Sequence, residues 1–398
     1  MEIKLIDLNR QYEPIKEKIN IKINEVINKT SFIMGENVIE FEKEFSKYIG
    51  VKHSISVANG TDALVIALKS LGIKEGDEVI TTPYTFFATA ESIVSVGAIP
   101  VFVDVRLDTY NIDEEKIEEK ITSKTKAILP VHIFGQPCNM LKINEIAKKH
   151  NLFVIEDACQ AVGAEFNGEK IGSLSDIACF SFFPTKNLGC AGDGGIITTN
   201  NDNLAIICKA YRSHGSGKDG IEAYNLLNNI KSNECYENGL DNTVYNPFKY
   251  YNYIIGYNSR LDEIQAAILR IKLPLLDEYT EDRISTTNYY NNKLKNTSLI
   301  VPKESNNIKH VYHLYILQSE KREIVTKYLK EKGIATGVYY QVPLHLQKAL
   351  IYLGHKIGDF PNSEYLSKRT FAIPLFPGMT FEEKKYIIDC IKESETLV

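Results

Sequence analysis

Short apolar runs rich in β-branched residues alternate with amphipathic stretches between residue 53 and about residue 213, and this alternation constrains the fold most. Helical patterns near residues 85–97, 113–121 and 139–150 separate several of the runs. Strands that alternate with helices form a largely parallel sheet with helices on both faces. We therefore predict an α/β domain with a mostly parallel, seven-stranded sheet, whose strands are HSISVA, DEVITT, IPVFVDV, TKAILPV, LFVIED, IACFSFF and GGIITTN.

The pattern changes in the last part of the chain. A long helical stretch at residues 259–279 ends the alternation, and an α+β pattern of three helices and one strand follows from about residue 285. A chain of 398 residues is long enough for two domains. We predict a large domain over residues 1–280, which includes an N-terminal helical segment, and a smaller α+β domain over residues 281–398.

Residues 217–252 break the pattern, because they are rich in Asn, Tyr, Gly and Lys and show no clear period. Ordered loops of this length are uncommon and are often functional. A variable surface excursion would have the same composition, so both interpretations stay open.

The charge and the cysteine content argue against several classes of protein. A net charge of −5 gives no reason to expect nucleic acid or an anionic membrane as a partner. No apolar run approaches the roughly 20 residues of a membrane span, and the N-terminus lacks the apolar segment of a signal peptide. The seven cysteines form no CxxC pair and no zinc spacing. We therefore predict reduced thiols, no metal site and a cytoplasmic location.

Polar residues stand directly after several of the expected strands. In an open parallel sheet, ligands bind beyond the carboxyl ends of the strands. Gly60 and Thr61 follow the first strand and begin a helix, whose free N–H groups and dipole suit a phosphate. Ser181 ends a later strand, where its hydroxyl is placed to bond a phosphate oxygen. A plain helix cap and a core serine are the structural alternatives.

Asp157 and Gln160 follow the strand LFVIE. A buried carboxylate costs free energy unless it is paired, and a protonated ring nitrogen would serve as its partner. Capping of the next helix is the alternative. Tyr84, Phe86 and Phe87 stand at another strand-to-helix junction, where one aromatic ring can lie flat on a planar ligand. Aromatic residues at such junctions more often belong to the core.

The stretch FPTKNLGCAGDGG, residues 183–195, places Lys186 ahead of four glycines. Glycine permits tight bends with positive φ, and a simple turn before the last strand is the alternative. An amine in a tight, partly desolvated loop has a lowered pKa and can form a Schiff base with an aldehyde. The candidate residues thus offer a lysine amine, a phosphate site, an aromatic face and a carboxylate that keeps a ring nitrogen protonated. This combination indicates a site for pyridoxal 5′-phosphate (PLP).

Several blocks of the chain resemble the DegT/DnrJ/EryC1/StrS sugar aminotransferases, which are fold type I PLP enzymes. They include NGTDAL, GDEVITTPYTFFAT, VIEDACQAVGA, FSFFPTKNLGCAGDGG and IGYNSRLDEIQAAILRIKL, and the resemblance covers nearly the whole chain. It implies that Lys186 is the Schiff-base lysine and also moves a proton, and that Asp157 pairs with the pyridinium nitrogen. It also implies a homodimer with shared active sites. The other implied cofactor contacts are Gly60, Thr61, Phe86, Gln160, Ser181 and, toward the neighbouring subunit's phosphate, Asn258.

The resemblance further implies a reaction that moves an amino group from L-glutamate to a keto group of a nucleotide-linked sugar. The block PTKNLGCAGDGG is similar to members that aminate C3. Amination at C4 and a non-catalytic regulatory role remain alternatives, whereas the related dehydratases have histidine in place of Lys186. The candidates for substrate contacts are Tyr84, His214, His313, Tyr339 and His345.

Two features depart from the family pattern. Tyr339-Tyr340-Gln341 stands where many members have His-Tyr-Pro, so the contacts with the acceptor are expected to differ. The insertion at residues 217–252 ends shortly before Asn258. We expect it to lie near the neighbouring subunit's active site and to cover the sugar nucleotide.

Overall fold

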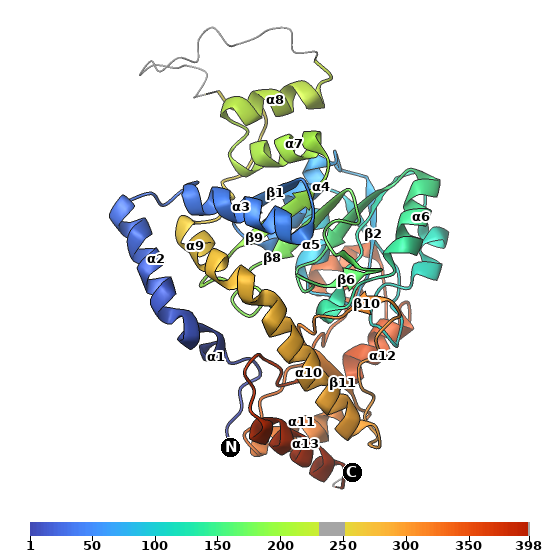
Figure 1. Cartoon of the computed structure of the whole chain (residues 1–398). Helices are drawn as coiled ribbons and strands as arrows, with labels where there is room; N and C mark the ends of the chain where they lie inside the picture. Colours follow the sequence, from blue (N-terminus) through green and yellow to red (C-terminus); the bar gives the residue numbers. More distant parts are fainter. Residues whose placement is uncertain (231–250, 397–398) are drawn as a thin grey trace.

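The computed structural model describes residues 1–230 and 251–396. Its centre is a seven-stranded sheet with the strand order β1-β9-β8-β5-β4-β2-β3 (Figure 1). Strand β9 runs antiparallel to its neighbours β1 and β8, and the other neighbouring strands are parallel. The predicted mostly parallel sheet is confirmed. Its strands are β1 (His53–Val57), β2 (Glu78–Thr81), β3 (Ile99–Phe102), β4 (Thr125–Ile128), β5 (Phe153–Asp157), β8 (Ile177–Ser181) and β9 (Gly195–Thr199).

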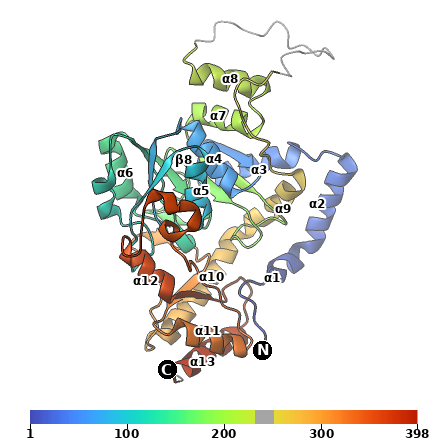
Figure 2. The ribbon, with the colours of Figure 1, turned by 180° about the vertical axis from the view of Figure 1, so that it is seen from behind.

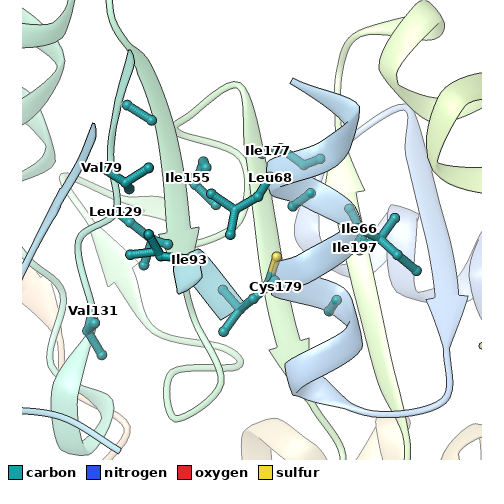
Figure 3. Packing of buried hydrophobic residues seen from close by; sticks show 14 of the residues in the cluster. Ile66, Leu68, Val79, Ile93, Leu129, Val131, Ile155, Ile177, Cys179 and Ile197 are labelled. Carbon is teal, nitrogen blue, oxygen red and sulfur yellow. The ribbon is translucent and has the colours of Figure 1, made fainter. Parts of the chain in front are cut away.

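Successive residues of the central strands point to opposite faces of the sheet and enter two separate cores. Ile155 of β5 belongs to one core, together with Leu68 (Figure 3). The adjacent Val154 belongs to the other. Helices α4 (Gly60–Ser70), α5 (Ala88–Ser95) and α7 (Asp202–Arg212) contribute to the first core. Helices α3 (Glu36–Ile49), α6 (Met140–His150) and α9 (Glu263–Lys272) contribute to the second.

A third core organises the last part of the chain. It includes residues of the antiparallel strands β11 (Tyr315–Gln318) and β12 (Thr370–Ile373). Ile3 belongs to the same core and pairs with Ile334, and both termini lie at this end of the molecule (Figures 1 and 2). The helices that contribute to it are α10 (Leu276–Leu294), α11 (Arg322–Glu331) and α13 (Phe381–Thr396).

The structure corrects two local assignments. Residues 113–121 form two short 3₁₀ helices, Glu114–Lys116 and Glu118–Lys120, instead of one α-helix. Their charged sequence, EEKIEEK, buries few side chains, so little packing stabilises a longer helix. The strand expected at residues 311–317 is shorter and occupies Tyr315–Gln318.

The long helix expected at residues 259–279 is interrupted. Helix α9 ends at Lys272, a 3₁₀ turn follows, and α10 then continues to Leu294. Pro274 lies in that turn, where it has no backbone N–H to donate to the preceding helical turn. The proposed boundary between residues 280 and 281 lies inside α10, and the two domain limits stay a prediction.

The insertion at residues 217–252 is partly regular. Gly217–Leu227 form helix α8, which packs on α7 beyond the edge of the sheet (Figure 1). The sequence prediction of a stretch without period was therefore wrong for this part. Residues 231–250 lie outside the described residues.

None of the helices in the described part of the chain is both long and apolar enough to cross a membrane. Within the same residues, no group of three or more His, Cys, Asp or Glu side chains is arranged to hold a metal ion. The six cysteines that the structure describes are all free thiols.

Strand β5 carries two adjacent carboxylates that point to opposite faces. Glu156 is fully buried and accepts hydrogen bonds from Ser175 Oγ at 2.7 Å and from His132 Nε2 at 3.0 Å. Nδ1 of His132 accepts the backbone N–H of Cys138, so the ring proton lies on Nε2 and faces Glu156. This network holds the carboxyl end of β5, where Asp157 follows.

Replacement of Glu156 by alanine should destabilise the protein by about 3–5 kcal/mol, because it leaves several buried donors without an acceptor. Urea denaturation measures this change. Glu169, exposed on the short strand β7 (Glu169–Lys170), provides the control, and Glu169→Ala should change stability by less than about 0.5 kcal/mol. Equal stability of the two variants would contradict the role of Glu156.

Candidate active site

Asp157 stands at the carboxyl end of β5 and is 5% exposed. Its Oδ2 accepts a hydrogen bond from Thr89 Oγ1 at 2.8 Å, and its Oδ1 accepts the backbone N–H of Cys159 at 3.3 Å. No ion pair joins it to a cation among the described residues. A buried carboxylate without a cationic partner is costly, so this position suits a ligand that brings a positive charge.

Lys186 lies in the loop between β8 and β9, where its backbone N–H donates to Phe183 O at 2.8 Å. The side chain is half-buried, and its amine makes no hydrogen bond or ion pair within the described chain. Burial lowers the pKa of Lys186 below its ordinary value, although the nearby Cys159 and Asp157 partly offset this effect. A larger fraction of this amine is therefore neutral and nucleophilic than in an exposed lysine.

The glycines after Lys186 serve a different purpose from the one expected. None of Gly189, Gly192, Gly194 and Gly195 has a positive φ, so the prediction of left-handed bends was wrong. Close approach requires two of them instead. A Cβ on Gly189 would lie 2.4 Å from Pro184 O, and a Cβ on Gly195 would lie 2.4 Å from Asn59 O. The missing side chains let the loop fold on itself and let β9 pack against the start of α4.

A narrow cradle forms where α4 begins. Asn59 caps the helix by accepting the N–H of Asp62 at 2.8 Å, and Gly60 is the first helical residue. A Cβ on Gly60 would lie 2.8 Å from Ser181 Cβ and 3.1 Å from Cys159 Sγ. Free N–H groups at a helix start and a serine hydroxyl suit a phosphate. Thr61, the next residue of α4, is half-buried beside this cradle.

Gln160 is fixed by two partners. Its Oε1 accepts the backbone N–H of Phe134 at 2.8 Å, and its Nε2 donates to the Tyr340 hydroxyl at 2.8 Å. The rings of Phe134 and Tyr340 lie nearly parallel, at 12°, with centroids 6.2 Å apart. Burial is the main cause that raises the pKa of Tyr340, and the charge of Asp157 adds to it. Asp157, Gln160 and Tyr340 are thus neighbours.

The two aromatic candidates of the TTPYTF block lie in different environments. Tyr84 is fully buried, and its hydroxyl bonds to the Tyr339 carbonyl at 2.6 Å and to Thr370 Oγ1 at 2.7 Å. Its hydrogen-bonding capacity is therefore used within the protein. Phe86 is 60% exposed just before α5, so its ring is accessible to a planar ligand.

Of the histidine candidates, His313 lies nearest the lysine. It is buried, and its Nδ1 lies 3.3 Å from Oδ1 of Asn187, the residue after Lys186. Burial lowers the pKa of His313 well below its ordinary value, and the charges of Lys186 and Arg283 add to this. The imidazole is therefore neutral at physiological pH.

The remaining candidates lie apart from this group. His345 is buried with its Nε2 3.2 Å from Glu364 Oε1, in a separate apolar cluster. His214 and Asn258 are exposed neighbours, since Ser213 pairs with Asn258 and the N–H of His214 donates to Tyr257 O. The position of Asn258 on an exposed face is compatible with a contact to a second subunit, which stays a prediction.

Sequence reasoning did not identify three residues of the site. Thr89 orients Asp157 from α5, and Phe134 supplies both a ring and a backbone donor. Tyr340 stands at the tyrosine of the family's His-Tyr-Pro pattern, but no role was assigned to it from the sequence. No local signal marks these residues, because each acts through a partner that is distant in the sequence.

The geometry agrees with comparisons to known proteins. The sequence profile of the DegT/DnrJ/EryC1/StrS aminotransferase family matches residues 13–392. The chain belongs to this family. A "pleiotropic regulatory protein" of Geobacillus stearothermophilus is 44% identical over 396 residues, which cover 99% of this chain and 98% of that protein. The UDP-N-acetyl-3-dehydro-alpha-D-glucosamine 3-aminotransferase of Acidithiobacillus ferrooxidans is 38% identical over 392 residues and 98% of each chain.

Solved structures of the family share the whole fold. S. venezuelae DesV, crystallised with a ketimine intermediate, superposes with a TM-score of 0.89 at 33% identity over 98% of each chain. NtdA of Bacillus subtilis contains bound PMP, the amine form of PLP, and superposes with a TM-score of 0.84. It is 31% identical over 99% of this chain and 85% of its own. This protein is therefore a fold type I, PLP-dependent aminotransferase, and the cradle, the free lysine and the cation-free Asp157 fit that cofactor.

Gly60→Ala should weaken PLP binding at least about tenfold, or about 1.4 kcal/mol, because the new methyl group fills the cradle between Ser181 and Cys159. Titration of the cofactor-free protein with PLP, followed by its visible absorbance, measures the affinity. Gly192→Ala is the control, since its methyl group would meet only the end of the flexible Gln265 side chain, at 3.1 Å. Equal affinity of the two variants would show that Gly60 does not shape the cradle.

In the cofactor-free protein, Lys186 should react with an acylating reagent at lower pH than exposed lysines do, because burial lowers its pKa. Brief labelling at a series of pH values, followed by mass spectrometry of the peptides, gives the extent of reaction at each lysine. Lys148, exposed on α6, is the comparator. Matching pH profiles for the two residues would rule out a special reactivity of Lys186.

Proposed function

We propose that this aminotransferase moves an amino group from L-glutamate to the C3 keto group of a nucleotide-linked deoxy-keto sugar. The observation that carries the proposal is the arrangement of the free Lys186 amine and the cation-free Asp157 carboxylate beside the Gly60–Ser181 cradle. The sugar substrate and the C3 position are supported by the name of the Acidithiobacillus relative and by the PTKNLGCAGDGG block.

When bound, PLP supplies an electron sink that stabilises negative charge at the carbon that loses its proton. Nζ of Lys186 would hold the cofactor and would also move the proton between the α-carbon of the donor and the cofactor. In the second half of the reaction the same atom returns a proton to the sugar carbon. The Asp157 carboxylate, oriented by Thr89, would balance a positive charge on the ring nitrogen. The exposed ring of Phe86 would lie on one face of the cofactor ring.

The proposed assembly is a homodimer in the cytoplasm. Asn258 would reach the phosphate in the neighbouring subunit, so each active site would need both copies. The segment at residues 217–252 would cover the sugar nucleotide bound in the neighbouring subunit's active site. The exposed His214 would lie beside this segment. Lys186, Asp157, Gly60, Thr61, Ser181, Gln160, Phe86 and Asn258 are the proposed cofactor contacts.

A regulatory role without turnover is the second candidate, because a relative with 44% identity is named as a pleiotropic regulatory protein. A protein that only binds a partner has no need for an amine with a lowered pKa next to a cation-free carboxylate. Amination at C4 uses the same cofactor chemistry and differs only in the placement of the sugar.

The purified holoenzyme should be yellow and should lose its visible band when L-glutamate alone is added, because the amino group is transferred to the cofactor. Lys186→Ala should abolish this change. Addition of 3-keto and 4-keto sugar nucleotides to the bleached enzyme should restore the band with a 3-keto compound. Arg106→Ala, which removes a half-buried side chain that pairs with Asp108, is the control and should bleach like the wild type.

The possible results separate the candidates. If glutamate removes the visible band and no keto sugar nucleotide restores it, the proposed sugar acceptor is refuted, but the protein remains an aminotransferase. Recovery with 4-keto compounds alone would assign C4. No bleaching by any amino donor would favour the regulatory role.

A further inference from the structure

The amide of Gln160 has a defined orientation. A backbone N–H can only donate, so the group that faces Phe134 N–H must be the amide oxygen. The NH₂ group therefore faces the Tyr340 hydroxyl, to which one of its two hydrogens is donated. The second hydrogen stays available. Gln160 thus meets a ligand as a hydrogen-bond donor.

Tyr340 reaches this amide from the segment between α11 and α12 (Pro361–Arg369). Its ring is held independently of the hydroxyl, since it stacks on Phe134 and meets Tyr84 edge-on at 6.0 Å. The Tyr84 hydroxyl also bonds the carbonyl of Tyr339. Removal of the Tyr340 hydroxyl alone should therefore leave the ring where it is.

Without that hydroxyl, the Gln160 amide keeps a single contact, at its oxygen. It can then pivot about the bond to Phe134 N–H, and its NH₂ group is no longer aimed in one direction. The titratable groups near Tyr340 are Asp157, Tyr339, Cys159 and Tyr84. None of these four replaces the lost contact, because in the described structure the Gln160 amide bonds only to Phe134 N–H and to the Tyr340 hydroxyl.

The resemblance to the family implies that Gln160 lies near the phenolic oxygen of bound PLP. We propose that Tyr340 is a positioning residue that fixes Gln160 as a hydrogen-bond donor to that oxygen. The inference rests on the proposed function, because it requires PLP attached to Lys186 with its ring at the end of β5. A donated hydrogen bond stabilises a negative charge on the oxygen. Tyr340 would in this way set the pH at which the bound cofactor changes colour.

The test is a pH titration of the visible spectrum of the holoenzyme without substrates. Tyr340→Phe keeps the ring and removes the hydroxyl, so the pH midpoint should rise by about one unit, the scale expected for a weakened hydrogen bond to a charged oxygen. Gln160→Leu should raise it at least as much. In the Gln160→Leu background, Tyr340→Phe should cause no further shift, because the two residues act through one contact.

Tyr110→Phe is the matched control. The Tyr110 hydroxyl also accepts a hydrogen bond from a glutamine amide, Gln318 Nε2 at 3.1 Å, and its ring also packs edge-on against Phe134, at 5.8 Å. This pair does not contact Gln160. Tyr110→Phe should leave the spectral midpoint unchanged, although it should lower the melting temperature of the cofactor-free protein about as much as Tyr340→Phe does.

A midpoint in Tyr340→Phe equal to that of the wild type would overturn the inference, and so would an equal shift in Tyr110→Phe. In both cases the proposed function would stand, since the wild type would still show the titrating band. If the wild type binds no PLP at Lys186, as judged by mass spectrometry after borohydride reduction, the proposed function itself fails.

Discussion

A buried carboxylate that lacks a charge partner at the end of β5 is the constraint on which the site depends. The two acids of this strand differ sharply. Glu156 is satisfied on one face of the sheet by His132, Ser175 and backbone donors, whereas Asp157 on the other face receives one hydroxyl and one long backbone contact. Desolvation makes such an arrangement unfavourable unless a cation completes it. Asp157 thus has no ion-pair partner among the described residues, and its position suits a cationic ring.

Two lysine amines in this part of the molecule, one buried and one half-buried, have separate tasks. Lys272 is 1% exposed and donates to Gly189 O at 2.6 Å, with the Tyr12 ring 4.6 Å away. Burial lowers its pKa to about 8, yet its hydrogen bond commits it to holding the loop that carries Lys186. The amine of Lys186 has no such bond and lies near Asp157. Burial alone therefore does not identify the reactive lysine, since a free amine beside a carboxylate is also required.

The sheet and the positions of the candidate residues at its strand ends were predictable from the sequence, and the reason is local. Each strand is an apolar run with its own boundaries, and Asp157 and Ser181 end two such runs. The wrong predictions also concern local features, such as the long helix that the structure interrupts at Pro274. Thr89 and Tyr340 could not be predicted, because their roles arise from contacts with residues 68 and 180 positions away.

Local patterns mark some residues, whereas other residues act only through distant contacts. This difference explains why the sequence indicates the cofactor chemistry more clearly than the acceptor. Cofactor contacts require particular residue types at strand ends, and the sheet brings these ends together at one edge. The acceptor candidates have no common framework: His345 is buried in its own cluster, and His214 is exposed beside α8. Tyr339 and Tyr340 are the exception, because hydrogen bonds join them directly to Tyr84 and Gln160, which follow strands β2 and β5. Selectivity for the acceptor should therefore depend most on Tyr339, which stands where many relatives have histidine.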